Sequence, residues 1–268
     1  MKNKLNNKKI AIVIAILAIL IIGIIIGIIA SMNKNSNEAT EPLVREEDGL
    51  PLTLTEENLN EMIDYMNSYD EIVIHYNVFE NIYDENNEYL DSNYIKGISS
   101  KINLLTLDEW TLDSNKIFLD KEDPDNYEPT EKELADATIT FEEAFGFDFK
   151  DYNNVYDLSC AIARTQGSVP ESFVGSKINV QMYDDLYEEY GKKYYFYENE
   201  NFDPQIEDYD EILSKQFKIV TNIDNLGKEH LQFIDATVVY TKDGKTIEKN
   251  WETIIWLMMD ENVINLEE

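Results

Sequence analysis

The sequence predicts an α+β fold behind a single N-terminal transmembrane helix. Three observations lead to this class: an unbroken apolar run over residues 10–30, a helix-period apolar pattern over residues 55–69, and a series of β-rich segments from residue 216 onward. Helices that precede an antiparallel meander are typical of α+β domains, so we expect helices packed on an antiparallel sheet in the exported part.

The apolar run is long enough to cross a bilayer. As a helix rising about 1.5 Å per residue, residues 10–30 would extend roughly 32 Å, against a hydrocarbon core of about 30 Å. Four lysines precede the run and no acid occurs before Glu38, which predicts a cytoplasmic tail of residues 1–9 and an extracytoplasmic C-terminal part. Signal-peptide apolar regions span about 7–15 residues, so an uncleaved, single-pass anchor in the cell membrane is favoured over a cleaved signal.

Gly23 and Gly27 lie four residues apart within the predicted span. This small-xxx-small spacing lets two membrane helices approach closely, which would support a homo-oligomer. Two such glycines also arise easily by chance in an isoleucine-rich helix, so both interpretations stay open.

The exported part is strongly acidic. Residues 38–268 hold all 54 acids and 17 of the 22 basic residues, which gives them a net charge of −37 against −32 for the whole chain. Such a field repels nucleic acid, and it attracts cations and basic partners; a solvated surface explains much of it equally well. Cys160 is the only cysteine, so no intrachain disulfide can form.

Several segments have clear local signals. Residues 31–50 are polar and aperiodic, which predicts a stalk. Thr55 is placed to cap a helix that runs to about Tyr69. Residues 71–79 have strand composition, and residues 84–88 have turn composition.

The stretch 120–130 is rich in proline and acids, and it predicts either a boundary between units at 51–130 and 131–268 or one long surface loop. Beyond it we expect a helix within 141–166 and another from about Lys177 to Tyr190. The Asp243-Gly244 pair predicts a hairpin turn. The remaining strands are expected at 216–224, 230–241, 246–259 and 263–266.

The closing pattern of the chain resembles a known family. It consists of Val238-Val239-Tyr240, Asp243-Gly244-Lys245, the run from Trp251 to Leu257, and Val263-Ile264-Asn265-Leu266. Because these segments follow one another in this order, the region of about 140–268 resembles nuclear-transport-factor-like (cystatin-like) α+β domains. Membrane-anchored bacterial subunits of conjugation and secretion machines include such domains, and the resemblance implies an assembly scaffold.

Catalytic and metal signatures are weak. His75, His230 and Cys160 lie far apart without a local motif, so we expect structural roles for them and no zinc site. Paired carboxylates carry little information in so acidic a chain, and no cofactor is expected. Only weak calcium binding stays open, by the candidate ligands Asp120, Glu122, Asp123 and Asp125.

A tyrosine cluster is the most unusual feature of the exported part. Tyr183, Tyr187 and Tyr190 share one stripe of the expected helix at 177–190, and Tyr194 follows them. The stripe suits either a helix packed on the sheet or a surface for a protein partner.

These observations favour a non-enzymatic, membrane-anchored interaction or assembly protein of a bacterial cell envelope with a protein partner, and the acidic charge would suit a basic one. An extracytoplasmic hydrolase with acidic catalytic residues and a ligand-binding or sensing domain are the alternatives. The lipid bilayer is the expected partner of residues 10–30, and nucleic acid is excluded.

Overall fold

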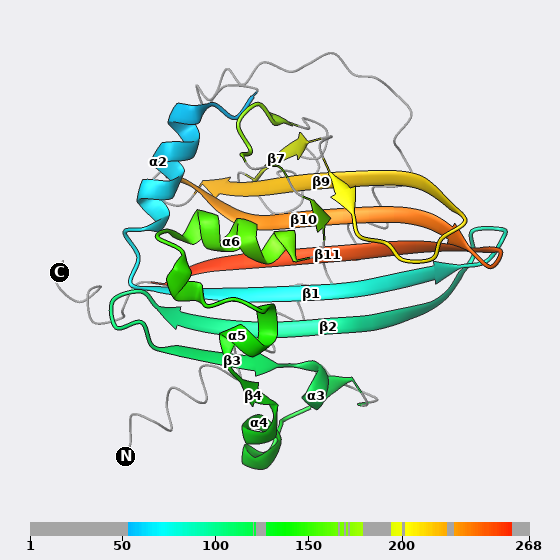
Figure 1. Ribbon diagram of the computed structural model, residues 1–268, viewed down its shortest axis with the longest axis horizontal. Coiled ribbons are helices and arrows are strands. Elements are labelled where there is room, and N and C mark those ends of the chain that lie inside the picture. Colours follow the sequence, from blue (N-terminus) through cyan, green and yellow to red (C-terminus); the bar gives the residue numbers. More distant parts are fainter. Residues whose placement is uncertain are drawn as a thin grey trace.

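An antiparallel sheet of nine strands, with helices packed against it, confirms the α+β class (Figure 1). The computed structural model describes residues 53–119, 121, 127–165, 167–168, 170, 172–178, 194–199, 202–223 and 228–258. The strand order across the sheet is β4-β3-β2-β1-β11-β10-β9-β7-β6, and β5 and β8 form a separate pair.

The strands are β1 Glu71–Tyr83, β2 Tyr89–Asn103, β3 Glu109–Asp113, β4 Thr138–Ile139, β5 Gly167–Ser168, β6 Lys177–Ile178, β7 Tyr194–Asn199, β8 Asp203–Pro204, β9 Glu211–Ile223, β10 Glu229–Lys242 and β11 Lys245–Met258. The helices are α2 Glu56–Met66, α3 Asn115–Phe118, α4 Glu131–Ala137, α5 Phe141–Phe145, the 3₁₀ helix η2 Phe149–Asp151 and α6 Val155–Arg164.

Helix α2 begins where the sequence predicts. The Thr55 side chain accepts a hydrogen bond from the backbone N–H of Asn58 at 3.2 Å, which satisfies one of the free N–H groups of the first turn. Leu59, Met62 and Met66 are buried against the sheet. The helix ends at Met66, one turn earlier than the pattern suggested.

Two predicted turns are confirmed. Between β1 and β2, the Asp84 carboxylate accepts hydrogen bonds from the backbone N–H groups of Asn86 and Glu88, at 2.8 and 2.9 Å. Between β10 and β11, Asp243 and Gly244 have φ angles of 51° and 74°. Two successive positive φ values are typical of the tight hairpin turn that Asp-Gly favours.

Strand β1 occupies the middle of the sheet, between β2 and β11. It pairs with β11 over its whole length, from Glu71 opposite Met258 to Tyr83 opposite Thr246. Residues 72–79 are all buried, so both faces of the sheet are covered at this strand. The C-terminal meander β9-β10-β11 is confirmed, but the sheet extends beyond it, because three strands from before residue 114 complete it across the expected boundary near 130.

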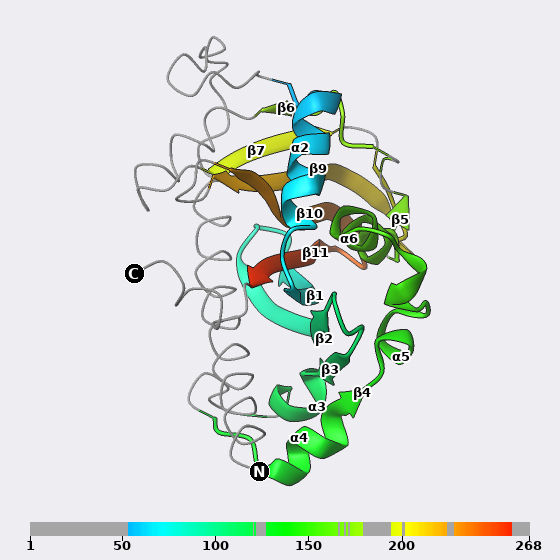
Figure 2. The same ribbon diagram turned by 90° about the vertical axis from the view of Figure 1, so that its left-hand side faces the viewer.

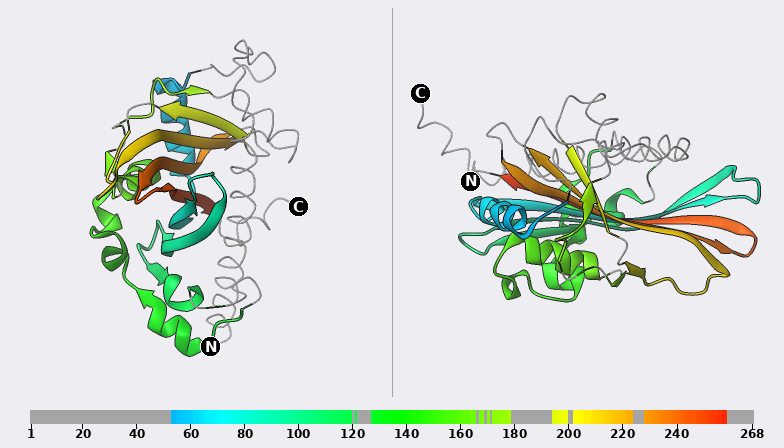
Figure 3. Two further views of the ribbon diagram at one scale, coloured as in Figure 1. Left: turned by 90° about the vertical axis from the view of Figure 1, so that its right-hand side faces the viewer. Right: turned by 90° about the horizontal axis from the view of Figure 1, so that it is seen from above.

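The described helices divide unequally between the two faces of the sheet (Figures 2 and 3). Helices α2, α5 and α6 lie on one face, where α6 contacts β10, β11 and α2. Helices α3 and α4 pack at the β3 edge on the other face, around Leu112, Ile117 and Ala137. We call these the helical face and the second face.

In the second half of the chain, the helices before residue 166 agree with the sequence prediction, whereas the segment from Lys177 does not. The helical segment expected within 141–166 is present as α5 and α6, and Gly146 ends α5 with a φ of 83°. The helix expected from Lys177 is wrong at its start, because Lys177 and Ile178 form β6 and pair with Glu198 and Tyr197 of β7. Backbone pairing with an adjacent edge outweighs the apolar spacing of this segment.

Other predictions fall outside the described residues: the anchor at 10–30 with Gly23 and Gly27, the stalk at 31–50, residues 179–193, and the terminal strand at 263–266. Within the part of the chain that the structure describes, no helix combines the length and the apolar character that a bilayer span requires.

Candidate functional site

The two faces of the sheet differ in chemistry. Successive side chains of a strand point to opposite faces, so Ile74, Tyr76 and Val78 of β1 face the helices and belong to the main apolar core. His75 and Asn77 point to the second face, and both are buried. A polar sheet face normally meets water, so buried polar side chains on the second face need an explanation.

A row of polar side chains crosses the second face from strand to strand. Asn77 of β1 lies opposite Glu252 of β11, Glu252 lies opposite Asp235 of β10, and Asp235 lies opposite Lys218 of β9. Neighbouring strands lie about 4.8 Å apart, so the row brings these side chains from four strands together. We call Asn77, Glu252, Asp235 and Lys218 the transverse row. All four residues are buried, and the Asp235 side chain is the more exposed of the two in the ion pair, at 12 % against 4 % for Lys218.

The ends of the transverse row are well bonded. The Lys218 ammonium donates to Asp235 Oδ2 at 3.3 Å, which pairs the only cation of the row with one carboxylate. At the other end, the Tyr94 hydroxyl donates to Asn77 Oδ1. The Tyr94 ring lies over Gly97, where an added Cβ would come within 2.8 Å of it, so the glycine leaves room for the ring.

The middle of the transverse row is not bonded. Among the described residues, neither carboxylate oxygen of Glu252 has a hydrogen-bond partner, and the same holds for Asp235 Oδ1 and Asn77 Nδ2. Only 4 % of Glu252 is exposed, so water does not compensate for the missing partners at its surface. Leaving a buried polar group without a partner costs about 1–3 kcal/mol, and more for a charged group.

Burial and charge set the protonation of this region. Burial first, and then the Asp235 carboxylate, raise the pKa of Glu252, while the Lys218 ammonium lowers it; together they bring this pKa to about 8. Burial, and then Glu252, raises the pKa of Tyr94. Burial lowers the pKa of His75 to about 4. At neutral pH the transverse row therefore holds a protonated Glu252 beside a neutral tyrosine and a neutral histidine.

A second group of polar side chains on the same face has its hydrogen-bonding groups paired. Glu248, four residues before Glu252 on β11, accepts hydrogen bonds from the amides of Asn250 and Asn81, at 3.2 and 3.4 Å. Asn81 in turn accepts from Ser92, and Asn250 accepts from Thr237. Glu248 and Glu252 are thus two buried carboxylates on one strand and one face, and only one of them is bonded.

The histidines and the cysteine form no catalytic pair in the described structure. His75 Nδ1 lies 2.9 Å from Ser99 Oγ on β2, and Cys160 is buried in α6. Burial raises the pKa of the Cys160 thiol to about 12, so the thiolate that nucleophilic catalysis needs does not form at neutral pH. The His230 ring lies 6.3 Å from that of Tyr65.

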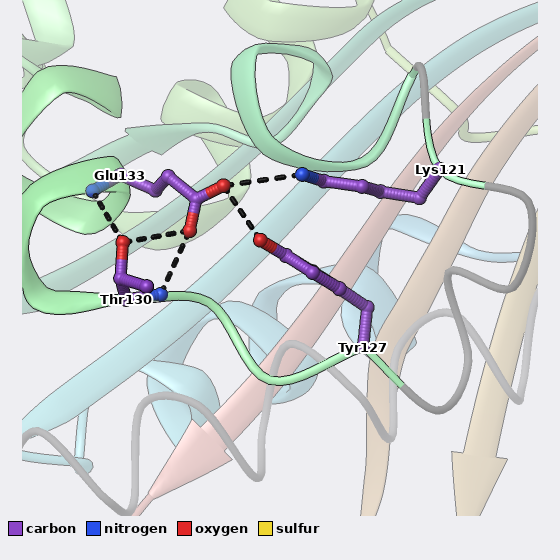
Figure 4. A network of polar contacts seen from close by, with 4 residues as sticks. All are labelled: Lys121, Tyr127, Thr130 and Glu133. Atoms are coloured by element: carbon purple, nitrogen blue, oxygen red, sulfur yellow. Dashed lines mark hydrogen bonds and ion pairs between the residues drawn. The ribbon is translucent and has the colours of Figure 1, made fainter.

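A compact polar network joins the two sides of the acidic stretch around 120–130 (Figure 4). Glu133 Oε1 accepts from the Tyr127 hydroxyl at 2.6 Å and from Lys121 Nζ at 3.1 Å, while Oε2 accepts from the N–H and the hydroxyl of Thr130. Tyr127 first, and then Thr130 and Lys121, lower the pKa of Glu133 to about 2. The bonds between Thr130 and Glu133 form the capping box of α4, so this part of the network has a local structural purpose.

The calcium candidates Asp120, Glu122, Asp123 and Asp125 lie outside the described residues. Across the described ranges, no three His, Cys, Asp or Glu side chains are arranged to hold a metal ion.

The end of the sheet farthest from α2 is acidic and partly apolar. It is formed by the β1–β2 turn, the β10–β11 turn and the segment before β9 (Figure 1). We call residues 83–91, 207–213 and 241–246 the hairpin end; they carry nine acids and two lysines, a net charge of −7. The described helices lie over the other half of the sheet (Figure 1). Large apolar side chains are exposed here by about half of their area: Tyr89, Leu90, Tyr209 and Leu213.

Of the four tyrosines singled out in the sequence, the structure describes only the backbone position of Tyr194. Tyr183, Tyr187 and Tyr190 lie outside the described residues, and Tyr194 begins β7 opposite Asn222 of β9. Sequence reasoning missed the transverse row, although a signal existed: polar residues at 248, 250 and 252 alternate with residues of the helical face. Such alternation normally indicates a solvated sheet face, so the pattern alone does not reveal burial.

Comparison with protein-family models finds no match for this chain, and a search among curated proteins finds no similar sequence. The likeness to nuclear-transport-factor-like domains therefore stays a prediction, and the functional argument rests on the geometry.

Proposed function

We propose that this chain is a membrane-anchored, extracytoplasmic interaction or assembly protein without enzymatic activity, and that its hairpin end contacts a basic protein partner. The observation that supports this most directly is the exposure of four large apolar side chains within a strongly acidic surface. Large apolar side chains in a polar setting are typical of protein–protein contacts.

Charge and shape favour the same kind of partner. The net charge of −7 at the hairpin end would steer a basic segment toward it and repel anionic surfaces. Tyr89 and Leu90 lie beside the turn acids Asp84, Glu85 and Glu88, and Tyr209 lies between Asp208 and Asp210. A basic segment with apolar side chains would meet both features, with the apolar contacts giving most of the affinity.

Site-specific photo-crosslinking in the native membrane tests the proposal. A photoreactive residue replaces Leu90 in the full-length chain, and the matched control carries it at Leu105. Leu105 is a leucine with 74 % exposure in the β2–β3 turn, at the opposite end of the sheet. We expect a discrete basic protein crosslinked from position 90 only, with a yield that falls as salt rises. Equal adducts from both positions, or lipid adducts alone, would contradict it.

One observation favours a hydrolase as a second candidate. Glu252 and Asp235 are neighbouring carboxyl groups, and the pKa of Glu252 is raised to about 8. A protonated carboxyl beside a second carboxylate is the combination that glycoside hydrolysis uses. In this case the full-length chain would release soluble sugars from cell-wall glycan, and Glu252→Gln would abolish the release while Glu248→Gln would not. Release that survives Glu252→Gln would exclude this role.

A further inference from the structure

We infer that the transverse row on the second face is a binding site for a primary ammonium group, held between Glu252 and Asp235. This site lies on a different surface from the hairpin end, so it stands apart from the proposed protein contact. The inference rests on which atoms of the row are unbonded, on their burial and on the balance of charge.

The unbonded acceptors match an ammonium group in number. Glu252 Oε1, Glu252 Oε2 and Asp235 Oδ1 are buried oxygens without a hydrogen-bond partner among the described residues. An ammonium group has three N–H donors and no acceptor. Asn77 Nδ2, the unbonded donor of the row, would serve the remaining lone pairs of the ionised Glu252 carboxylate. A bound ammonium would thus satisfy the groups that the folded chain leaves unbonded.

The charge of the row is also one cation short. Lys218 balances Asp235, and among the described residues no second cation is paired with Glu252. The groups that face Glu252 from the neighbouring strands supply no cation: Tyr94 of β2, His75 and Phe79 of β1, and Phe233 and Thr237 of β10. Glu248, on β11 itself, adds another acid. In the free protein a proton on Glu252 supplies the missing charge.

Binding therefore exchanges one proton for one ammonium. The Glu252 carboxyl releases its proton to solvent, the carboxylate that remains accepts the N–H groups, and the total charge of the site is unchanged. The low exposure of the row strengthens each of these bonds, because water competes poorly at a buried site. An uncharged ligand would leave the proton on Glu252. Proton release on binding therefore distinguishes an ammonium ligand from a neutral one.

Calorimetry on the purified full-length chain tests the exchange. Methylammonium is the probe for a free amine, Nα-acetyl-lysine methylamide is the probe for a lysine side chain, and acetamide is the neutral control. Titrations in two buffers of different ionisation enthalpy measure the protons released. With a Glu252 pKa of about 8, we expect nearly one proton per ligand at about pH 6 and almost none at about pH 9.5.

Two variants test whether ammonium binding depends on Glu252 itself or on the acidic charge of the whole surface. Glu252→Gln keeps the shape and removes the charge, and should weaken methylammonium binding by at least about tenfold and abolish proton release. Glu248→Gln, on the same strand and face, should bind as the natural chain does. As a measurement that needs no variant, the ¹³C signal of the Glu252 carboxyl should move to its ionised position when methylammonium is added.

The outcomes decide the inference. Binding of methylammonium with proton release supports it, and the lysine probe then shows whether a side chain can reach the row. Equal binding of acetamide, binding without proton release, or no binding of either amine would overturn it. The last result would leave buried water as the occupant of the row.

Discussion

Replacing Glu252 by glutamine should make the protein more stable at alkaline pH, which is an unusual result for a buried polar position. The pKa of Glu252 is raised from 4.5 to about 8 by burial, so the folded state holds a proton that the unfolded state releases between these values. The free energy of unfolding must then fall as pH rises through this window. A difference of about 3.5 units corresponds to at most about 5 kcal/mol, a large part of a typical stability of 5–15 kcal/mol.

Glutamine does not titrate, so the variant should lack this slope. Its amide can also donate to the unbonded Asp235 Oδ1. Urea unfolding of both full-length chains at about pH 5, 6.5 and 8.5 measures the effect: we expect similar stabilities at about pH 5 and a variant more stable by several kcal/mol at about pH 8.5. Glu248→Gln is the matched control, and it should lose about 1–3 kcal/mol near neutral pH, because its carboxylate accepts two hydrogen bonds. A difference between Glu252→Gln and the natural chain that is independent of pH would refute the reasoning.

Three further predictions concern the same face and the core. His75 has a pKa lowered to about 4, so the natural chain should lose up to about 3 kcal/mol as pH falls from 6.5 toward 4, and His75→Gln should remove that loss in acid unfolding curves. Gly97→Ala should cost about 1–3 kcal/mol in urea unfolding, because the new Cβ would lie 2.8 Å from the Tyr94 ring and displace its hydroxyl from Asn77; an unchanged stability would contradict this. Cys160 should resist iodoacetamide at about pH 8 until urea unfolds the chain, because its pKa is about 12; fast labelling of the folded chain would show an accessible thiolate.

The local features of the fold could be predicted because their signals are short in range. Thr55 caps α2, and Asp243-Gly244 turns the last hairpin, since each depends on only a few neighbouring residues. The place of β1 could not be predicted, because its partner β11 lies some 170 residues later and the proline-rich stretch between them suggested a boundary. The helix predicted from Lys177 was wrong for a related reason. Lys177 and Ile178 pair with the edge of β7, and the local apolar spacing contains no information about that pairing.

The candidate site was missed for a different physical reason. Alternating polar residues in β9, β10 and β11 predict a polar face, but burial depends on how the whole sheet is assembled. Asp235, Lys218 and Glu252 come from three strands, and only the register places them in one row. More of the hairpin end could be predicted, because the sequence indicates both its acidic charge and its turns at 84–88 and 243–244.

Glu248 and Glu252 differ in their hydrogen bonding, and the difference distinguishes a residue that supports the fold from a candidate functional residue on the second face. A buried polar network that only supports the fold is expected to satisfy its members, as the chain of Ser92, Asn81, Glu248 and Asn250 does. Glu252, four residues after Glu248 on the same strand, breaks that rule, because neither of its carboxylate oxygens has a hydrogen-bond partner among the described residues. Violations of local consistency tend to occur at functional sites, where stability is given up for binding or catalysis. Both glutamates are buried and lie on one strand and one face, so the difference in bonding between them argues against a general tolerance of this sheet for unbonded acids, and it supports the proposed ammonium site.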